Sequence, residues 1–72
     1  MLSWEVIRVV RINGENLDVV GKSVKEYLNS AGYDLMRVAV ELNGNIVSKA
    51  KYASAIFKDG DIVEIVSFVG GG

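Results

Sequence analysis

Two Asn-Gly dipeptides, each between runs of β-branched residues, constrain the fold of this 72-residue chain more than any other feature of its sequence. They are Asn13-Gly14 and Asn43-Gly44. A two-residue type I′ turn requires positive φ at both central positions, which Asn and Gly tolerate better than other residues. The sequence therefore predicts two β-hairpins. Their four strands are expected over residues 4–12, 15–20, 37–42 and 45–48.

A short helix is predicted between the two hairpins. Ser23 and Glu26 have the spacing of a capping box, in which each side chain accepts a hydrogen bond from the backbone N–H of the other residue. Apolar residues follow on one face at positions 24, 27, 28 and 31, and Gly32 suits the left-handed position that ends a helix. We therefore expect a helix over residues 23–31.

The remaining segments complete a pattern of five strands and one helix. We expect a loop over residues 33–36, and a loop or single helical turn over residues 49–58, whose Tyr, Ile and Phe side chains fill the edge of the core. Asp59-Gly60-Asp61 predicts a turn. Residues 62–69 form the last strand, which is apolar on both faces except at Glu64 and Ser67 and so is expected at the centre of a sheet.

One helix can bury its apolar stripe only by lying across one face of a single sheet. The sequence therefore predicts an α+β protein of the β-grasp, or ubiquitin-like, type, with a mixed sheet of four to five strands. A chain of 72 residues allows one domain, covering residues 1–72. The predicted core consists of Val10, Ile12, Leu17, Val19, Val24, Leu28, Ala31, Val38, Val40, Leu42, Val47, Ile56, Val63 and Ile65.

Composition argues against several classes of function. The chain has no Cys and no His, which excludes disulfides, thiol nucleophiles, imidazole catalysis and the usual zinc sites. Eight Lys and Arg against nine Asp and Glu give a formal net charge of −1, without the basic excess typical of nucleic-acid binding. Asp59, Asp61 and Glu64 are too few for a calcium site, so we expect no metal.

Without a signal-like start or a long apolar segment, the chain is expected to be soluble and cytoplasmic, with no membrane partner.

Three glycines, residues 70–72, follow the last predicted strand directly. Glycine has no Cβ and samples φ and ψ freely, so these residues predict a thin, flexible tail that could thread a narrow channel and present the Gly72 carboxylate. The alternative is an ordinary frayed terminus, because chain ends are often disordered without any function.

Three segments carry a family signature: residues 38–47 (VAVELNGNIV), 58–66 (KDGDIVEIV) and 68–72 (FVGGG). In this order they resemble the ThiS family, the sulfur carriers of thiamine biosynthesis. The resemblance extends back through residues 11–15 and the capped helix, and it leaves out residues 1–7. The family has a β-grasp fold, so the resemblance implies the same architecture as the pattern of strands and helix.

The resemblance also implies a carrier that is not itself an enzyme. Gly72 would be adenylated by a partner, an adenylating enzyme of the ubiquitin-activating type that uses ATP, and converted to a thiocarboxylate while Gly70 and Gly71 thread the partner's active site. Sulfur would come indirectly from a cysteine desulfurase or a rhodanese-like protein, and the product would deliver it to thiazole synthase. The carrier would bind no cofactor of its own.

Partner binding is expected on the sheet face that the helix leaves open. If Val63 and Ile65 point inward, alternation turns the side chains between and after them outward. The predicted docking residues are Ala39, Glu41, Glu64, Val66, Phe68 and Val69. The alternative for Phe68 is that it packs against the edge of the sheet or against the long first strand.

Two other functions remain open from the sequence. The small subunit of molybdopterin synthase, the sulfur carrier for molybdenum cofactor, also ends in Gly-Gly. A ubiquitin-like modifier, or an interaction module without terminal chemistry, would share the fold. A thiocarboxylate at the terminus would indicate a carrier, whereas conjugates to lysine would indicate a modifier.

Overall fold

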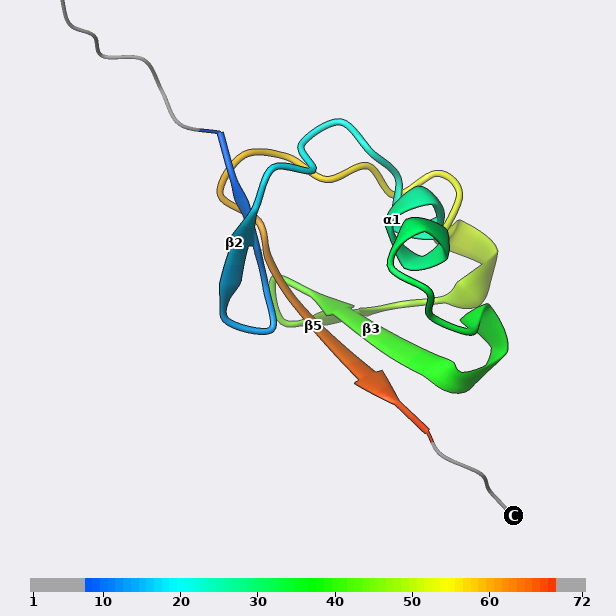
Figure 1. Cartoon of the computed structure of the whole chain (residues 1–72). Coiled ribbons are helices and arrows are strands. Elements are labelled where there is room, and N and C mark those ends of the chain that lie inside the picture. The colour runs from blue at the N-terminus through cyan, green and yellow to red at the C-terminus, as the bar shows by residue number, and fades with distance from the viewer. Residues whose placement is uncertain (1–7, 69–72) are drawn as a thin grey trace, which may run out of the picture.

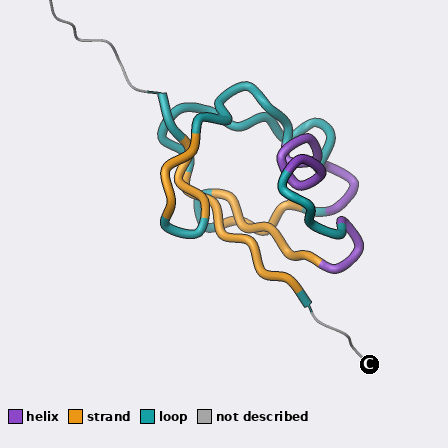
Figure 2. Tube along the Cα trace, in the orientation of Figure 1, coloured by secondary structure: helices purple, strands orange, loops and turns teal. Residues whose placement is uncertain are grey.

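A five-stranded sheet forms one layer of the molecule, and a single α-helix lies across one of its faces (Figure 1). The computed structural model describes residues 8–68. The strands are β1 (Val10–Ile12), β2 (Glu15–Leu17), β3 (Val38–Leu42), β4 (Asn45–Val47) and β5 (Ile62–Ser67). The helix is α1 (Val24–Ser30), and two 3₁₀ turns, η1 (Leu35–Arg37) and η2 (Lys49–Lys51), lie in the connections (Figure 2). Over residues 8–68, no helix is long and apolar enough to span a membrane.

Strand β5 occupies the centre of the sheet, whose order is β2-β1-β5-β3-β4. It runs parallel to β1 and antiparallel to β3, so the sheet is mixed. Both hairpins, β1–β2 and β3–β4, therefore pair with β5 from opposite sides. The predicted β-grasp architecture and the central place of the last strand are confirmed.

Both predicted hairpin turns are confirmed by the backbone. Asn13 and Gly14 have φ of 51° and 84°, and Asn43 and Gly44 have φ of 50° and 87°. The two Asn side chains also bind β5. Asn13 Oδ1 accepts a hydrogen bond from the backbone N–H of Ile65 at 2.7 Å and its Nδ2 donates to the Ile65 carbonyl at 3.1 Å, while Asn43 Oδ1 accepts from Ile62 N–H at 2.8 Å.

The capping box is present as predicted. Ser23 Oγ accepts from Glu26 N–H at 3.0 Å, and Glu26 Oε1 accepts from Ser23 N–H at 2.8 Å. These bonds satisfy backbone donors that the first turn of a helix otherwise leaves without partners. Ala31 is the C-cap, and Gly32 follows with φ of 85°. The helix, Val24–Ser30, is therefore one residue shorter at each end than predicted, with Ser23 and Ala31 as its caps.

The core lies between α1 and the sheet. Its buried apolar members are Val10, Ile12, Val24, Leu28, Val38, Val40, Tyr52, Phe57, Val63 and Ile65. The predicted core positions Leu17, Val19, Leu42 and Val47 are half-buried and pack against this cluster. Two predicted members are wrong, because Ala31 and Ile56 are exposed.

Ile56 and Phe57 show why the second of these predictions fails. The segment is extended here, with a β-bridge between Ser23 and Ile56 and a hydrogen bond from Phe57 N–H to the Lys22 carbonyl at 2.9 Å. Neighbouring side chains of an extended segment point to opposite sides. Phe57 therefore enters the core, at 1% exposure, and Ile56 points outward, at 44%. Ala31 fails for another reason, since it lies at the C-cap beyond the last helical turn.

Several strands are shorter than predicted. β1 begins at Val10 and not at residue 4; residues 8 and 9 are not in the strand, and residues 4–7 lie outside the described part of the chain. β2 ends at Leu17 and not at residue 20, because Lys22 N–H donates to the Val19 carbonyl in a turn. The connection predicted as a loop over residues 33–36 contains the start of η1, and β3 accordingly begins at residue 38. Of the two alternatives expected after β4, a loop or a single helical turn, the structure has a helical turn, η2, and β4 ends one residue earlier than predicted.

We expect Phe57→Ala to lower the free energy of unfolding by about 3–5 kcal/mol, because it removes a fully buried ring and leaves a cavity. The ring also meets Tyr27 edge-on, with centroids 6.2 Å apart. Urea denaturation measures the change, and Phe57→Leu, which preserves more of the packing, should lie between Phe57→Ala and the wild type. Ile56→Ala is the matched control and should cost less than about 1 kcal/mol. Equal losses at the two positions would contradict the observed packing.

Burial raises the pKa of the Tyr52 phenol above its ordinary value of 10.0, and burial, with Tyr33 and Glu15 nearby, raises the pKa of Tyr27 likewise. Above about pH 10 the unfolded chain therefore loses these protons before the folded chain does, and stability falls as pH rises. When the pH is raised from about 8 to about 11, we expect the free energy of unfolding to fall less for Tyr52→Phe than for the wild type. Denaturation at the two pH values tests this, and identical losses would be the contrary result.

Candidate functional site

The sheet face opposite α1 is open to solvent. Along β5, Val63 and Ile65 are buried under the helix, whereas Glu64 and Val66 are exposed, with Val66 at 56%. This is the alternation of a strand with one face in the core. The open face is therefore formed by the side chains that the sequence pattern turns outward.

Strand register brings five of the predicted docking residues together. Ala39 lies opposite Val66 and Glu41 lies opposite Glu64 on the neighbouring strands β3 and β5. Phe68 follows β5, and its backbone N–H donates to the Arg37 carbonyl at 2.7 Å, which continues the pairing beyond the strand. We call these five residues, Ala39, Glu41, Glu64, Val66 and Phe68, the open-face patch. Their role in docking remains a prediction.

Phe68 keeps 55% of its surface exposed, so it is not packed away at the sheet edge. With Val66 it places two large apolar side chains in solvent near the end of β5. Exposed apolar groups gathered on one face are typical of an interaction surface. The other predicted site residues, Val69, Gly70, Gly71 and Gly72, lie outside the described part of the chain.

Glu41 and Glu64 form a pair of like charges across β3 and β5. Residues directly opposite on antiparallel strands have Cβ atoms about 4.5–5.5 Å apart, so the two carboxylates repel each other. The ion pair found among residues 8–68 joins Arg37 to Asp34 at 3.5 Å and so compensates neither glutamate. The open-face patch is therefore apolar and acidic, and a cationic group from a partner would relieve the repulsion.

The carboxylates of the turn before β5 have structural partners. Asp59 Oδ1 accepts a hydrogen bond from Val9 N–H at 3.0 Å. Asp61 Oδ2 accepts from Lys58 N–H at 2.7 Å, and its Oδ1 accepts from Asn43 Nδ2 at 3.0 Å. These bonds hold the turn against both hairpins, which agrees with its interpretation as a structural turn.

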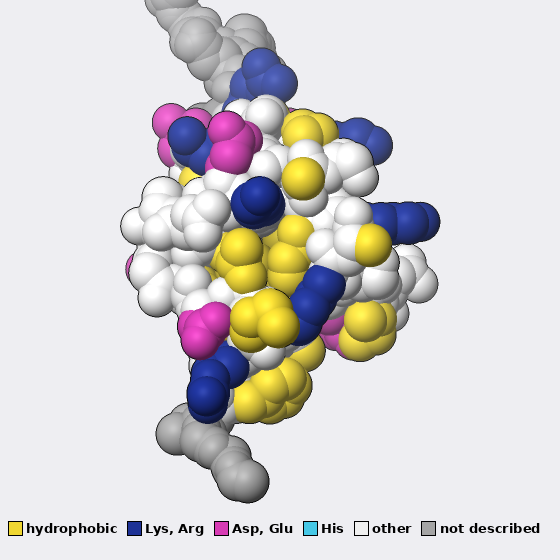
Figure 3. Space-filling model, turned by 90° about the vertical axis from the view of Figure 1, so that its right-hand side faces the viewer, with side chains coloured by type: hydrophobic (Ala, Val, Ile, Leu, Met, Phe, Trp, Pro, Cys, Tyr) yellow, Lys and Arg dark blue, Asp and Glu magenta, His cyan; other side chains and the backbone are white. Residues whose placement is uncertain are grey.

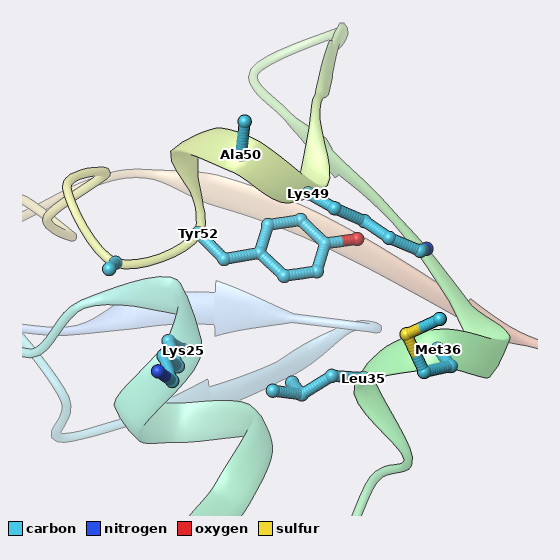
Figure 4. Close-up of a pocket in the computed structure, with 7 residues that line it drawn as sticks. Lys25, Leu35, Met36, Lys49, Ala50 and Tyr52 are labelled. Carbon is cyan, nitrogen blue, oxygen red and sulfur yellow. The ribbon is translucent and has the colours of Figure 1, made fainter.

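A concavity that the sequence did not indicate lies at the end of the molecule formed by α1, η1 and η2. It has a volume of about 210 Å³. Its lining residues are Lys25, Leu35, Met36, Lys49, Ala50, Tyr52 and Ala53 (Figure 4). These side chains come from separate elements, so no local motif could have predicted it. We call it the lysine-rimmed pocket.

Residues 10–72 match the model of the ThiS family. The chain belongs to the ThiS family. It is 38% identical over 64 residues to the sulfur carrier protein ThiS of Thermus thermophilus, a match that covers 89% of this chain and 100% of that protein. The resemblance seen in the sequence is confirmed.

A solved structure shows the same fold. The crystal structure of the thiamine biosynthesis protein ThiS from Geobacter metallireducens superimposes with a TM-score of 0.74 at 32% identity, covering 89% of this chain and 99% of that one. The β-grasp arrangement seen here is therefore the arrangement of an experimentally determined family member.

Two relatives are much longer proteins. The chain is 45% identical over 62 residues to a thiazole synthase of Paramagnetospirillum magneticum and 33% identical over 64 residues to one of Magnetococcus marinus. It spans 19% and 20% of their lengths, against 100% of the Thermus protein. In both thiazole synthases, a region similar to this chain is thus part of the larger polypeptide.

We expect Glu64→Gln to raise the free energy of unfolding of the isolated protein by about 0.2–1 kcal/mol, because it removes the repulsion with Glu41. The gain should shrink at high salt, since salt screens exposed charges. Urea denaturation at low and high salt measures both effects. Glu15→Gln is the control, because Glu15 lies opposite the apolar Ile12 and should change stability by less than about 0.5 kcal/mol. A loss of stability in Glu64→Gln would refute the repulsion.

Proposed function

We propose that this chain is a sulfur carrier protein of thiamine biosynthesis and that it acts as a substrate of other enzymes, not as an enzyme. The observation that carries this proposal is the match to ThiS: the family model extends to residue 72, and the Thermus sulfur carrier is matched over its whole length. The carrier group would be the carboxylate of Gly72. The absence of Cys and His from the sequence accords with a protein that leaves the chemistry to its partners.

Two steps would convert the Gly72 carboxylate to a thiocarboxylate. The carboxylate first attacks the α-phosphorus of ATP in the adenylating partner, which releases pyrophosphate and forms an acyl-adenylate. Sulfide, or sulfur relayed from a persulfide with a thiol as reductant, then attacks the carbonyl carbon and displaces AMP. Activation is needed because a free carboxylate is a poor electrophile. Glycine at the reacting position allows the partner's groups to approach closely, and the partner's active site holds them in the geometry of attack.

The chain has no cysteine to carry a persulfide, so persulfide sulfur would come from another protein. A cysteine desulfurase or a rhodanese-like protein, working through the adenylating enzyme, would supply it. Thiazole synthase would receive the sulfur. The two thiazole synthases that contain a region similar to this chain support that partnership, since domains joined in one polypeptide are held at high effective concentration.

The reach of the terminal residues limits where these partners bind. Gly72, the proposed carrier group, is four residues beyond Phe68, and four residues span at most about 14 Å when fully extended. A catalytic group that acts on Gly72 must therefore come within about that distance of Phe68, so the partner covers the surface around it. The open-face patch, which includes Phe68 itself, is the docking surface that we propose for the adenylating enzyme.

The experiment that tests the carrier function is the intact mass of the protein after incubation with ATP, the adenylating enzyme and sulfide. We expect the wild type to gain the mass difference between one sulfur and one oxygen. A variant that lacks Gly72 is the control for the position of the change, and omission of ATP is the control for activation.

A gain of sulfur without ATP, or in the variant that lacks Gly72, would contradict adenylation at that residue. No gain in the wild type would remove the carrier function. Conjugates between Gly72 and lysine side chains would indicate a ubiquitin-like modifier in its place.

A further inference from the structure

The lysine-rimmed pocket lies beside the place where the chain leaves the sheet toward its terminus. Arg37, whose carbonyl accepts the hydrogen bond from Phe68, directly follows Met36 in η1. Met36 lines the pocket and has 75% of its surface exposed. An enzyme that acts on the proposed carrier group, Gly72, must come within about 14 Å of Phe68, and Met36 of the pocket is the neighbour of the residue that Phe68 pairs with.

The pocket has an apolar floor and a basic rim. In Figure 4 the Tyr52 ring lies between η2 and α1, Leu35 faces it from η1, and the side chain of Lys49 runs alongside the ring. Lys25 borders the pocket from α1. Figure 3 views this end of the molecule and shows hydrophobic side chains in the middle of the face, with Lys and Arg side chains beside them and Asp or Glu side chains also bordering the face. Among residues 8–68, no Asp or Glu lines the pocket.

Lys49 is held in position and keeps binding capacity. Its ammonium group donates to the Val38 carbonyl at 3.0 Å and lies 5.7 Å from the centroid of the Tyr52 ring. An ammonium group has three N–H donors, so further donors remain after the bond to Val38. A cation fixed in this way loses little side-chain entropy when it binds a carboxylate.

The size of the pocket favours a protein segment over a small molecule. Its volume of about 210 Å³ lies below the roughly 300–1,000 Å³ that is typical of small-molecule sites. A pocket of this size accommodates one anchoring side chain of a partner, and buried anchors surrounded by complementary polar groups are the usual source of affinity in interfaces.

We propose that the lysine-rimmed pocket is a second docking site, which takes an acidic segment of a protein that receives the carrier's terminus. An apolar side chain of this segment fills the space between Met36, Leu35 and Tyr52, and an adjacent Asp or Glu pairs with Lys25 and Lys49. This inference rests on the proposed function for the identity of the partner. Because the open-face patch is acidic and the pocket is basic, the two surfaces select segments of opposite charge.

Binding of two proteins to charge and packing variants tests this inference. The probes are the adenylating enzyme and thiazole synthase, each titrated with the carrier by calorimetry. We expect Lys25→Glu and Met36→Asp each to raise the Kd for the same enzyme about tenfold. Both side chains are exposed, so thermal unfolding should confirm that the variants fold. Met36→Leu, which keeps an apolar side chain, should retain wild-type affinity.

The charge control is Lys58→Glu, which makes the same change on the turn before β5 and should alter neither Kd by more than about twofold. Salt should weaken the wild-type complex more than the Lys25→Glu complex, because the wild type has one more ion pair to screen. Unchanged affinity of Lys25→Glu and Met36→Asp for both enzymes would overturn the pocket's role, and so would equal weakening by Lys58→Glu.

The intact-mass experiment on the same wild-type protein separates this result from the carrier function. If the wild type gains sulfur while both pocket variants bind as it does, the carrier function stands and the second docking site falls. If the wild type binds neither enzyme and gains no sulfur, both fall.

Discussion

Strand β5 is the constraint on which the rest of this fold depends. It pairs with β1 on one side and with β3 on the other, so each hairpin joins the sheet only through it. The side-chain amides of Asn13 and Asn43 then bind the β5 backbone at Ile65 and Ile62. The residues that make the hairpin turns possible thus also fix the register of the central strand. The same two residues therefore form the hairpin turns and bind the hairpins to β5.

The position of β5 also determines which surfaces of the molecule lie near the C-terminal end of this strand. The strand ends at Ser67, between an open sheet face and the pocket formed by α1, η1 and η2. Its outward side chains meet Ala39 and Glu41 of β3 on the acidic face, while Met36 and Lys25 border the basic pocket. The proposed function requires one carrier group to meet different enzymes, and two unlike surfaces would let each enzyme be recognised by separate contacts.

Sequence patterns predicted the elements that depend on local chemistry. The Asn-Gly turns, the Ser23–Glu26 capping box and the alternation of β5 are each specified by a few neighbouring residues, and each is confirmed. The core contribution of residues 52–57 was only partly predicted. An irregular segment has no periodicity from which to tell Phe57, which is buried, from Ile56, which is exposed.

Of the two candidate surfaces, one was predictable from the sequence and the other was not. Strand alternation was enough to predict the open-face patch, because pairing of β3 with β5 brings Glu41 opposite Glu64 and Ala39 opposite Val66. The lysine-rimmed pocket could not be predicted, since Lys25, Met36 and Tyr52 come together only after α1, η1 and η2 have packed. A pocket of this kind forms only in the tertiary structure, from segments that are separate in the sequence, so no single sequence motif indicates it.

The parallel pairing of β1 with β5 has a consequence for how the chain folds. Arg11 pairs with Ile62, which is 51 positions later in the sequence, so the two halves of the sheet remain separate until β5 is available. Contacts of such long sequence separation slow folding, because a large loop must close before they form. During synthesis on the ribosome, β5 is the last of the described strands to emerge. The nascent chain therefore stays without a complete core until β5 has been synthesised and has left the ribosome.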